Sequence, residues 1–267
     1  MIDPKVQQEL RERFNPEGSM LRKHQMRMLE MLIEVDKICQ KHNIKYWIEG
    51  GTLLGAVRHG GFIPWDDDLD IAVMHDEYKK MLEVLEKELP ENMKVQTFKT
   101  DRKFCSFIAK VRDLNSEIVE YGYPEYKFNG IYIDIFPMRK INKKLSYLSW
   151  AIHYHILIPY AIRKSPNIKF KIKNRIIIYK LCKILFSLLN IINYIFPNKK
   201  INYDWGTYFK NNSSEADIFP LTRISFEGFD FNAPNNYDNV LHNCYGDYNK
   251  LPNLDKTHSH LLSIKIQ

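Results

Sequence analysis

Four aspartates fall within five positions of the sequence: Asp66, Asp67, Asp68 and Asp70, in the stretch WDDDLDI. Carboxylates this close repel one another, and burial adds to the cost of ionising them, so such a cluster normally requires a cation or a water-facing turn. Asp68 and Asp70 are two residues apart where a strand is expected to start, which places both side chains on one face. Oxygen ligands favour Mg²⁺ (or Mn²⁺) over zinc, and Mg²⁺ usually shares its remaining positions with substrate phosphates. The spacing therefore predicts a Mg²⁺ site that acts on a phosphorylated compound.

Asp134 is the candidate third ligand of this site. It stands among apolar neighbours in GIYIDIFP, and an isolated carboxylate in mid-strand is explained by a cation or a polar cleft on that face. A hydrogen-bonded strand end is the plainer alternative. We expect Asp68, Asp70 and Asp134 to be both metal ligands and catalytic residues in a phosphoryl or nucleotidyl transfer.

Two other interpretations of the acidic cluster compete with a catalytic metal site. An EF-hand loop would place Glu77 at its twelfth position, but its sixth position, where the sharp turn requires glycine, is Ile71. A solvated acidic turn is the simpler alternative. The alternation of Leu69, Ile71 and Val73 weighs against it, because that pattern is typical of a buried strand.

A glycine turn precedes the aspartates. The apolar strand expected over 44–49 ends at Gly50 and Gly51, and Thr52 is the expected N-cap of a helix through TLLGAVRH. Backbone N–H groups at such a turn can approach phosphates. We therefore expect Gly50, Gly51 and Thr52 to bind substrate.

Further candidate substrate-binding residues lie around these motifs. Lys110 and Arg112 share one face of an expected strand and are candidates to hold a diphosphate, with a solvated edge strand as the alternative. Arg58 and His59 end the glycine-turn helix and would reach a phosphate, order the acidic loop or cap the helix. Trp65 is a candidate wall of a cage for a quaternary ammonium group. Asp66 and Asp67 complete the set.

The elements that must position these residues follow from the periodicity of apolar side chains. Helices are expected over 21–42, from Thr52 and over 78–89, and strands over 44–49, 69–73, 95–99, 104–113, 116–122 and 130–137, the last ended by Pro137. Strands that mix with helices in this order predict an α+β fold. The four cysteines have no close pairing and are expected to be buried thiols.

One segment differs from the rest in charge. Fourteen of the 39 Lys and Arg residues lie between Ile135 and Tyr203, where there is no Asp or Glu. Its stretch RIIIYKLCKILFSLLNIINYIF is expected to be a helix that is partly core and partly a face toward an anionic membrane surface, with a helical lid carrying solvated lysines as the alternative. We divide the chain into a catalytic core (1–138), this basic apolar segment (139–203) and a loop-rich part that completes the catalytic domain (204–267).

The stretch GGTLLGAVRHGGFIPWDDDLDI, the later YIDIFP and the tail YGDYNKLP together resemble the LicD family, over residues 22 to 256. The resemblance implies a nucleotidyltransferase-like mixed sheet flanked by helices, here with a basic helical insertion. It also implies transfer of phosphocholine from CDP-choline to sugars of lipopolysaccharide or teichoic acid. Asp68 and Asp70 match the family's Asp-x-Asp metal pair, and Asp134 its third acidic position. Fukutin-related relatives, with a zinc-binding cysteine cluster and ribitol phosphate as cargo, fit the cysteine spacing less well.

Several functions share this metal geometry. Ethanolamine, glycerol or ribitol phosphate could replace phosphocholine, and a nucleotidyltransferase would move NMP from an NTP. A glycosyltransferase and a catalytically silent membrane scaffold are the remaining alternatives. The expected partners are CDP-choline or a similar CDP-alcohol, a glycan or glycolipid acceptor and an anionic membrane surface, with no nucleic acid. The N-terminus has no apolar signal-peptide region, so we expect a cytoplasmic protein at the inner face of the membrane.

Overall fold

The computed structural model describes residues 2–120, 126–162, 172–197, 199–207, 212–257 and 261–266. Its centre is a mixed sheet of strand order β1-β2-β6-β4-β3, with β7 also paired to β6. The strands are β1 (Tyr46–Ile48), β2 (Asp70–Met74), β3 (Met93–Gln96), β4 (Ala109–Asp113), β6 (Tyr132–Asn142) and β7 (Lys199–Tyr203). β2 and β6 are parallel, and the other pairs are antiparallel. Fully buried Ile71, Val73, Ile133 and Ile135 hold the two central strands in the core.

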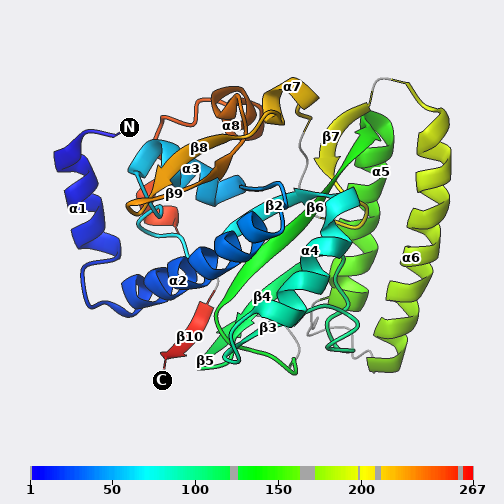
Figure 1. The fold of residues 1–267 in the computed structure, drawn as a ribbon, viewed down its shortest axis with the longest axis horizontal. Coiled ribbons are helices and arrows are strands. Elements are labelled where there is room, and N and C mark those ends of the chain that lie inside the picture. The colour runs from blue at the N-terminus through cyan, green and yellow to red at the C-terminus, as the bar shows by residue number, and fades with distance from the viewer. Residues whose placement is uncertain are drawn as a thin grey trace.

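Helices cover the sheet and extend it to one side. α2 (Met20–Lys41) and α4 (His75–Glu88) cross one face of it (Figure 1). α3 (Gly50–His59) packs beside β2. α8 (Tyr237–Tyr245) and the hairpin of β8 (Thr222–Phe226) and β9 (Phe229–Ala233) pack against α3 and β1. The remaining elements are α1 (Pro4–Phe14), α7 (Glu215–Ile218), η2 (Leu254–Lys256) and the pair of β5 (Ser116–Glu120) with β10 (Leu261–Ile266). This arrangement confirms the predicted α+β class.

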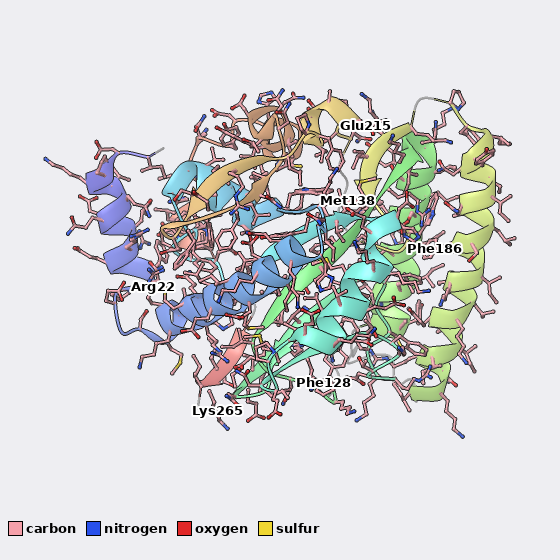
Figure 2. The ribbon with its side chains drawn as sticks, viewed as in Figure 1. Arg22, Phe128, Met138, Phe186, Glu215 and Lys265 are labelled. Atoms are coloured by element: carbon pink, nitrogen blue, oxygen red, sulfur yellow. The ribbon has the colours of Figure 1, made fainter. Side chains whose placement is uncertain are left out.

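The basic segment forms a helical insertion between two paired strands. It contains α5 (Lys143–Ile152), the π-helical η1 (His153–Ile162) and α6 (Ile172–Ile195). These helices share an apolar cluster of their own, in which Phe186 lies between α6 and the body of the protein (Figure 2). The boundary predicted after residue 138 falls inside β6, because β6 continues to Asn142 and pairs there with β7. Residues 163–171 of the basic segment lie outside the described residues.

Pro137 does not end its strand, contrary to the prediction. The N–H of Asp134 donates to the carbonyl of Leu69, on the β2 side of β6. Successive N–H groups of a strand point to opposite sides, so an N–H at position 137 would point away from β2, toward the edge that pairs with β4 and β7. There β4 has ended opposite Ile135 and β7 begins opposite Met138. The proline therefore falls in the gap between two partners, where no donor is needed.

Two smaller expectations also need correction. The helix that follows β1 begins at Gly50, with Glu49 rather than Thr52 in the N-cap position. Among the cysteines, Cys244 is exposed, while the other three are buried as expected. Strand β5 keeps the predicted start at Ser116, and the last two residues of the predicted range, 121 and 122, lie outside the described residues.

Candidate functional site

Three elements meet where the aspartates lie. Asp70 begins β2 directly beside Asp134 of the parallel strand β6. The N–H of Asp70 donates to the hydroxyl of Thr52 in α3, at 2.8 Å, and its carbonyl accepts from the N–H of Glu49, at 3.0 Å. Thr52 is therefore a positioning residue that fixes the start of α3 against the acidic strand. The predicted strand, glycine turn and helix are brought to the Asp-x-Asp motif as expected.

A cleft of about 530 Å³ opens at this meeting point. Its walls include Gly50 and Gly51 at the start of α3 and the carboxylates of Asp66, Asp68 and Asp70. Three aromatic residues from distant segments also line it: Trp150, Tyr203 and Tyr245. The cleft thus combines acidic oxygens, a helix N-terminus and aromatic surface.

Both glycines are required by the close approach of carboxylates. Gly50 has a φ of +58°, and a Cβ there would lie 3.1 Å from Oδ2 of Asp70. A Cβ on Gly51 would lie 2.8 Å from Oδ2 of Asp66, closer than real side chains come. The positive φ at Gly50 and the missing side chain at Gly51 therefore let the acidic residues reach the start of the helix.

The cluster is electrostatically unfavourable when ionised. Burial, with the charge of Asp67 adding to it, raises the pKa of Asp66 to about 7. Burial likewise raises the pKa of Asp68, and the neighbouring carboxylates Asp66 and Asp70 raise it further. For Asp70, burial and the charge of Asp134 raise the pKa well above its ordinary value. Carboxylates that repel one another in a buried site are stabilised as anions by a bound cation.

The residues present fit a hard divalent cation. Asp66, Asp67 and Asp68 each offer a carboxylate oxygen within 4.8 Å of the others. Within the described part of the chain, the buried Oδ1 of Asp68 has no hydrogen-bond partner. Oxygen ligands of this kind suit Mg²⁺ or Mn²⁺.

Asp134 is held differently from the other aspartates. The ammonium group of Lys110 lies 2.9 Å from its Oδ1 and 3.2 Å from its Oδ2, and sits over the ring of Tyr132. Lys110 therefore reaches the acidic site, as a partner of Asp134. Whether Asp134 also binds metal stays a prediction.

Besides Thr52, Asp67 and Lys110, which adjoin the acidic residues, four predicted binding residues do not line this cleft. Arg112 is fully buried and donates to Oε1 of Gln96 and to the carbonyl of Gly130, both at 2.8 Å. Trp65 packs edge-on against Phe14 and His59. Neither side chain lines the cleft, so the structure gives no support to a diphosphate contact by Arg112 or a cage wall at Trp65.

Arg58 and His59 connect α3 to the ends of the chain. Arg58 donates to the carbonyl of Tyr248 at 2.7 Å and, through Nε, to Nε2 of His59 at 2.9 Å. Nδ1 of His59 faces Oε1 of Gln7 in α1 at 2.6 Å. Of the predicted roles, these contacts fit the ordering of the helix end rather than phosphate binding.

The buried pair of Arg58 and His59 predicts that the stability of the protein depends on pH. Burial and the charge of Arg58 lower the pKa of His59 to about 3, so the folded protein binds fewer protons than the unfolded chain between pH 6.5 and 3. The contribution of His59 to the free energy of unfolding is fully present above pH 6.5. Below pH 6.5 it falls by about 1.4 kcal/mol per pH unit. When the free energy of unfolding is measured by urea denaturation between pH 6.5 and 5, it should fall less steeply with decreasing pH in His59→Gln than in wild type. The exposed His155→Gln is the control, and equal slopes in all three proteins would contradict the prediction.

Sequence reasoning missed the residues that hold the acidic loop. Nε2 of the buried His24 lies 2.8 Å from the carbonyl of Asp67, and the Gln25 amide donates to the carbonyl of Asp66 at 2.9 Å. Asn15 in turn donates to Gln25 at 2.6 Å. Both α2 residues are completely buried. Their only signal in the sequence is two polar residues near the start of an otherwise amphipathic helix.

The aromatic lining of the cleft was missed as well. Tyr203 donates to Glu49 at 3.1 Å, and the same carboxylate accepts from the indole of Trp47 at 2.6 Å. These bonds hold Tyr203 beside the glycine turn. Trp150 lies in the insertion, where no motif marks it, and Tyr245 closes α8, just before the glycine of the tail motif.

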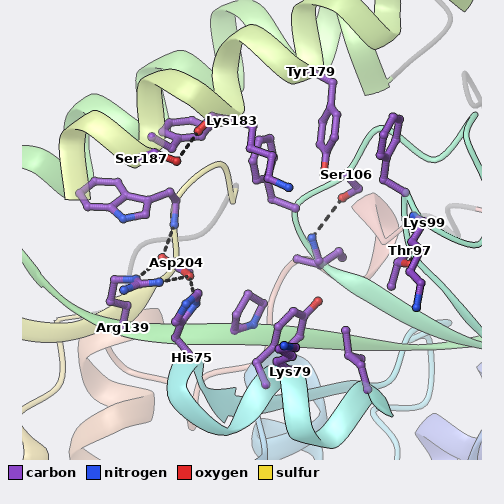
Figure 3. Close-up of a pocket in the computed structure, with 18 of the residues that line it drawn as sticks. His75, Lys79, Thr97, Lys99, Ser106, Arg139, Tyr179, Lys183, Ser187 and Asp204 are labelled. Atoms are coloured by element: carbon purple, nitrogen blue, oxygen red, sulfur yellow. Dashed lines mark hydrogen bonds and ion pairs between the residues drawn. The ribbon is translucent and has the colours of Figure 1, made fainter. Parts of the chain in front are cut away.

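A larger cleft, of about 990 Å³, lies between α4 and α6 (Figure 3). At one end Asp204 accepts from Nε of Arg139 at 2.6 Å and faces His75 at 2.5 Å. Pro137 and Arg139, which line it, are an odd number of residues from Asp134 and so face the other side of β6. None of the predicted site residues lines this cleft, so we place the chemistry in the smaller one.

The parallel strands β2 and β6 carry Asp70 and Asp134 side by side, next to a helix that begins with two glycines. The family model described as the LicD/FKTN/FKRP nucleotidyltransferase domain matches residues 43–166, which contain every acidic residue of the cleft. Over this domain the chain is similar to the LicD family.

Curated relatives agree with this assignment. The chain is 29% identical over 247 residues to the lipopolysaccharide cholinephosphotransferase LicD of Haemophilus influenzae, covering 87% of this chain and 92% of that protein. A stretch of 36 residues is 50% identical to the human ribitol 5-phosphate transferase FKRP, covering 14% of this chain and 7% of that one. Among solved structures, ANT(2")-Ia in complex with adenylyl-2"-tobramycin matches at 13% identity over 62% of this chain and 95% of that chain, with a TM-score of 0.27.

Proposed function

We propose that the protein transfers phosphocholine from CDP-choline to a sugar hydroxyl of a bacterial surface glycan, such as lipopolysaccharide, capsule or teichoic acid, and releases CMP. Its similarity to the LicD cholinephosphotransferase and to the ribitol 5-phosphate transferase FKRP supports a phospho-alcohol transferase that acts on glycans. The choice of choline and of the CDP donor is the proposal. The observation that carries it is the meeting of carboxylates, a glycine-opened helix N-terminus and aromatic side chains in one cleft.

The acidic residues would bind the metal, and the start of α3 would bind phosphate. A Mg²⁺ or Mn²⁺ ion held by Asp66 and Asp68, whose carboxylate oxygens lie close together, and by Asp70 in the same cleft would neutralise the charge that develops on the transferred phosphate. The first N–H groups of α3, at Gly50 and Gly51, would bind phosphate oxygens, which the positive end of a helix favours. Lys110 keeps Asp134 oriented beside Asp70.

The proposed transfer is a single displacement. The acceptor hydroxyl oxygen forms a bond to the distal phosphorus of the donor, and the bond from that phosphorus to the bridging oxygen breaks. CMP leaves with the bridging oxygen. The hydroxyl proton passes to the carboxylate of Asp70 or Asp134. For Asp70, burial and the charge of Asp134 raise the pKa, which makes this carboxylate a better base.

The aromatic residues supply the reason to prefer choline. A quaternary ammonium group cannot donate hydrogen bonds and is attracted to aromatic faces, best of all to tryptophan. Trp150, Tyr203 and Tyr245 offer such faces in the same cleft as the carboxylates. We place the cage role predicted for Trp65 on these residues instead.

Trp150→Leu should therefore lower the preference for CDP-choline over CDP-ethanolamine. We expect the ratio of kcat/KM for the two donors to fall by about fivefold or more, from the loss of one cation–π contact. Trp65→Leu is the matched control, because that side chain packs away from the cleft. If Trp65→Leu changes the ratio and Trp150→Leu does not, the cage is not where we place it.

Donor-dependent thermal stabilisation tests the proposed function without an acceptor. The protein with Mg²⁺ is heated with CDP-choline, CDP-ethanolamine, CDP-glycerol, CDP-ribitol, CTP or ATP, since a bound donor raises the melting temperature by mass action. The largest rise should come with CDP-choline and disappear in Asp68→Asn. A rise with CTP or ATP alone, with pyrophosphate released, would instead identify a nucleotidyltransferase. A larger rise with another CDP-alcohol would reassign the cargo.

A further inference from the structure

The outer face of α6 is apolar and open to solvent. Six residues spaced by four and three positions form one stripe along the helix, each between 52% and 78% exposed: Ile177, Leu181, Ile184, Leu188, Ile191 and Ile195. The helix lies along one edge of the molecule (Figure 1), and the exposure of these six residues places the stripe on its solvent side. A contiguous apolar patch of this kind marks an interaction site.

The opposite face of α6 is also apolar and is already used. Tyr179, Cys182, Phe186 and Leu189 are buried in the cluster shared with α5 and η1. The buried Arg175 donates to the carbonyls of Ala161 and Ile162 and ties the start of the helix to η1. The helix is therefore apolar around most of its circumference, which in soluble proteins is typical of a buried helix.

The charges around the stripe all have one sign. Lys173, Lys180 and Lys183 are exposed on α6, and the described residues show no carboxylate within ion-pair distance of them. Lys143, Lys144 and Lys200, near the two ends of the insertion, are exposed as well. From Phe136 to Asn202 the sequence has no acidic residue. Whatever covers the stripe must accept positive charge at its border.

We propose that the stripe of α6 lies in an anionic membrane surface, with its side chains at the boundary of head groups and acyl chains and the lysines among the phosphates. This inference goes beyond the proposed function, because it concerns where the enzyme sits and not what it transfers. The charge pattern and the unpartnered stripe together carry it.

A second copy of the chain fits the stripe less well. The four-and-three spacing would suit a pair of helices, but each copy would bring only lysines to the other, and α6 has no acidic residue to pair with them. Like charges along both edges would repel.

A bilayer-crossing α6 fits less well too. The helix Ile172–Ile195 is long and apolar enough by composition, with an 18-residue window of mean hydropathy 1.7. Its inner face, however, is packed on α5 and η1, and both ends of the insertion return to neighbouring strands of the sheet, where Asn142 pairs with Lys199. A helix tied to the body in this way lies on a membrane more readily than across it.

Vesicle co-sedimentation of the full chain tests the proposal. The wild type should bind vesicles of phosphatidylcholine with phosphatidylglycerol, bind pure phosphatidylcholine far more weakly, and lose binding as salt rises. The double variant Leu181→Glu, Leu188→Glu should bind at least about tenfold more weakly. Leu114→Glu, a change at an exposed leucine far from α6 in sequence, is the matched control. Lys180→Gln and Lys183→Gln should each cost roughly fivefold.

Several outcomes would overturn the proposal. Absence of binding to anionic vesicles, or equal binding by the double variant and the wild type, rejects a membrane role for the stripe. A dimer in light scattering that the double variant abolishes would assign the stripe to a second copy. Protein that alkaline carbonate fails to release from membranes would indicate a crossing helix. Donor-induced stabilisation of the double variant should equal that of wild type, which separates this test from that of the proposed function and shows that the variant is folded.

Discussion

Asp70→Asn is expected to lower kcat by at least about a thousandfold while raising the melting temperature of the metal-free protein. Asp70 is central to the site because it adjoins Asp134 and lies in the cleft with Asp66 and Asp68. An amide keeps the shape but loses the negative charge that a divalent cation requires and the ability to accept a proton. Loss of turnover would therefore come from chemistry and not from misfolding.

The rise in melting temperature has a defined pH dependence. Burial and the charge of Asp134 raise the pKa of Asp70 in the folded state. Between the ordinary pKa of an aspartate and this raised pKa, the unfolded chain releases a proton that the folded protein holds, so stability falls as the pH rises. At pH 8 the variant should melt about 2 to 8 °C above wild type. The difference should shrink as the pH falls toward the ordinary pKa of an aspartate, where the wild-type carboxyl is protonated in the folded state.

The exposed Asp230→Asn, on β9, serves as the matched control and should leave both quantities near wild type. Turnover by Asp70→Asn within tenfold of wild type would remove Asp70 from the catalytic machinery. If Asp70→Asn and wild type melt at the same temperature at pH 8, repulsion within the acidic cluster does not lower the stability of the wild type.

Gly51→Ala should lower kcat/KM by about a hundredfold without lowering stability. Alanine is a better helix former than glycine, so α3 itself gains. The new methyl group would lie 2.8 Å from Oδ2 of Asp66 and must push that carboxylate away. A displacement of about 1 Å at a reacting centre costs roughly two orders of magnitude in rate. Activity and stability should therefore move in opposite directions.

A double-mutant cycle identifies the cause of that loss. If the methyl group acts by displacing Asp66, then Gly51→Ala should have little further effect in an Asp66→Ala background. Thermal unfolding of the four proteins gives the stability side of the cycle, and steady-state kinetics with Mg²⁺ gives the other. Full additivity of the two changes in rate would mean that Gly51 matters for another reason, such as direct contact of its N–H with the donor.

Much of the site could be predicted from short-range pattern. The glycine pair, the Asp-x-Asp spacing and the lone Asp134 each lie on an element of few residues, and β2 and β6 then place them in register. Lys110 and Arg112 do share a face, as the spacing predicts. Their surroundings differ, because the side chain of Arg112 is held in the core by hydrogen bonds to Gln96 and Gly130. The alternation of side chains along a strand predicts which face a residue lies on but not whether it is buried.

The rest of the site depends on contacts between distant segments. Trp150 reaches the cleft from the insertion, about 80 residues after Asp70 in the sequence, and His24 and Gln25 hold the acidic loop from a helix that precedes it. β6 continues past Pro137, although local rules predict that a strand ends at proline, because the exchange of β4 for β7 beside β6 leaves a gap for this residue. Such features arise from tertiary pairing, which a single sequence does not encode locally.

The helical insertion leaves and re-enters the sheet at one place, since Asn142 and Lys199 are paired neighbours. The residues between Asn142 and Lys199 therefore form an insertion whose length and sequence can change without altering the register of Asp70 and Asp134. We call this insertion a cassette. It nevertheless contributes Trp150 to the cleft. Recombination that replaced the cassette as a unit would therefore exchange an aromatic wall of the cleft together with the outer helix, in one genetic event that leaves the acidic strands untouched.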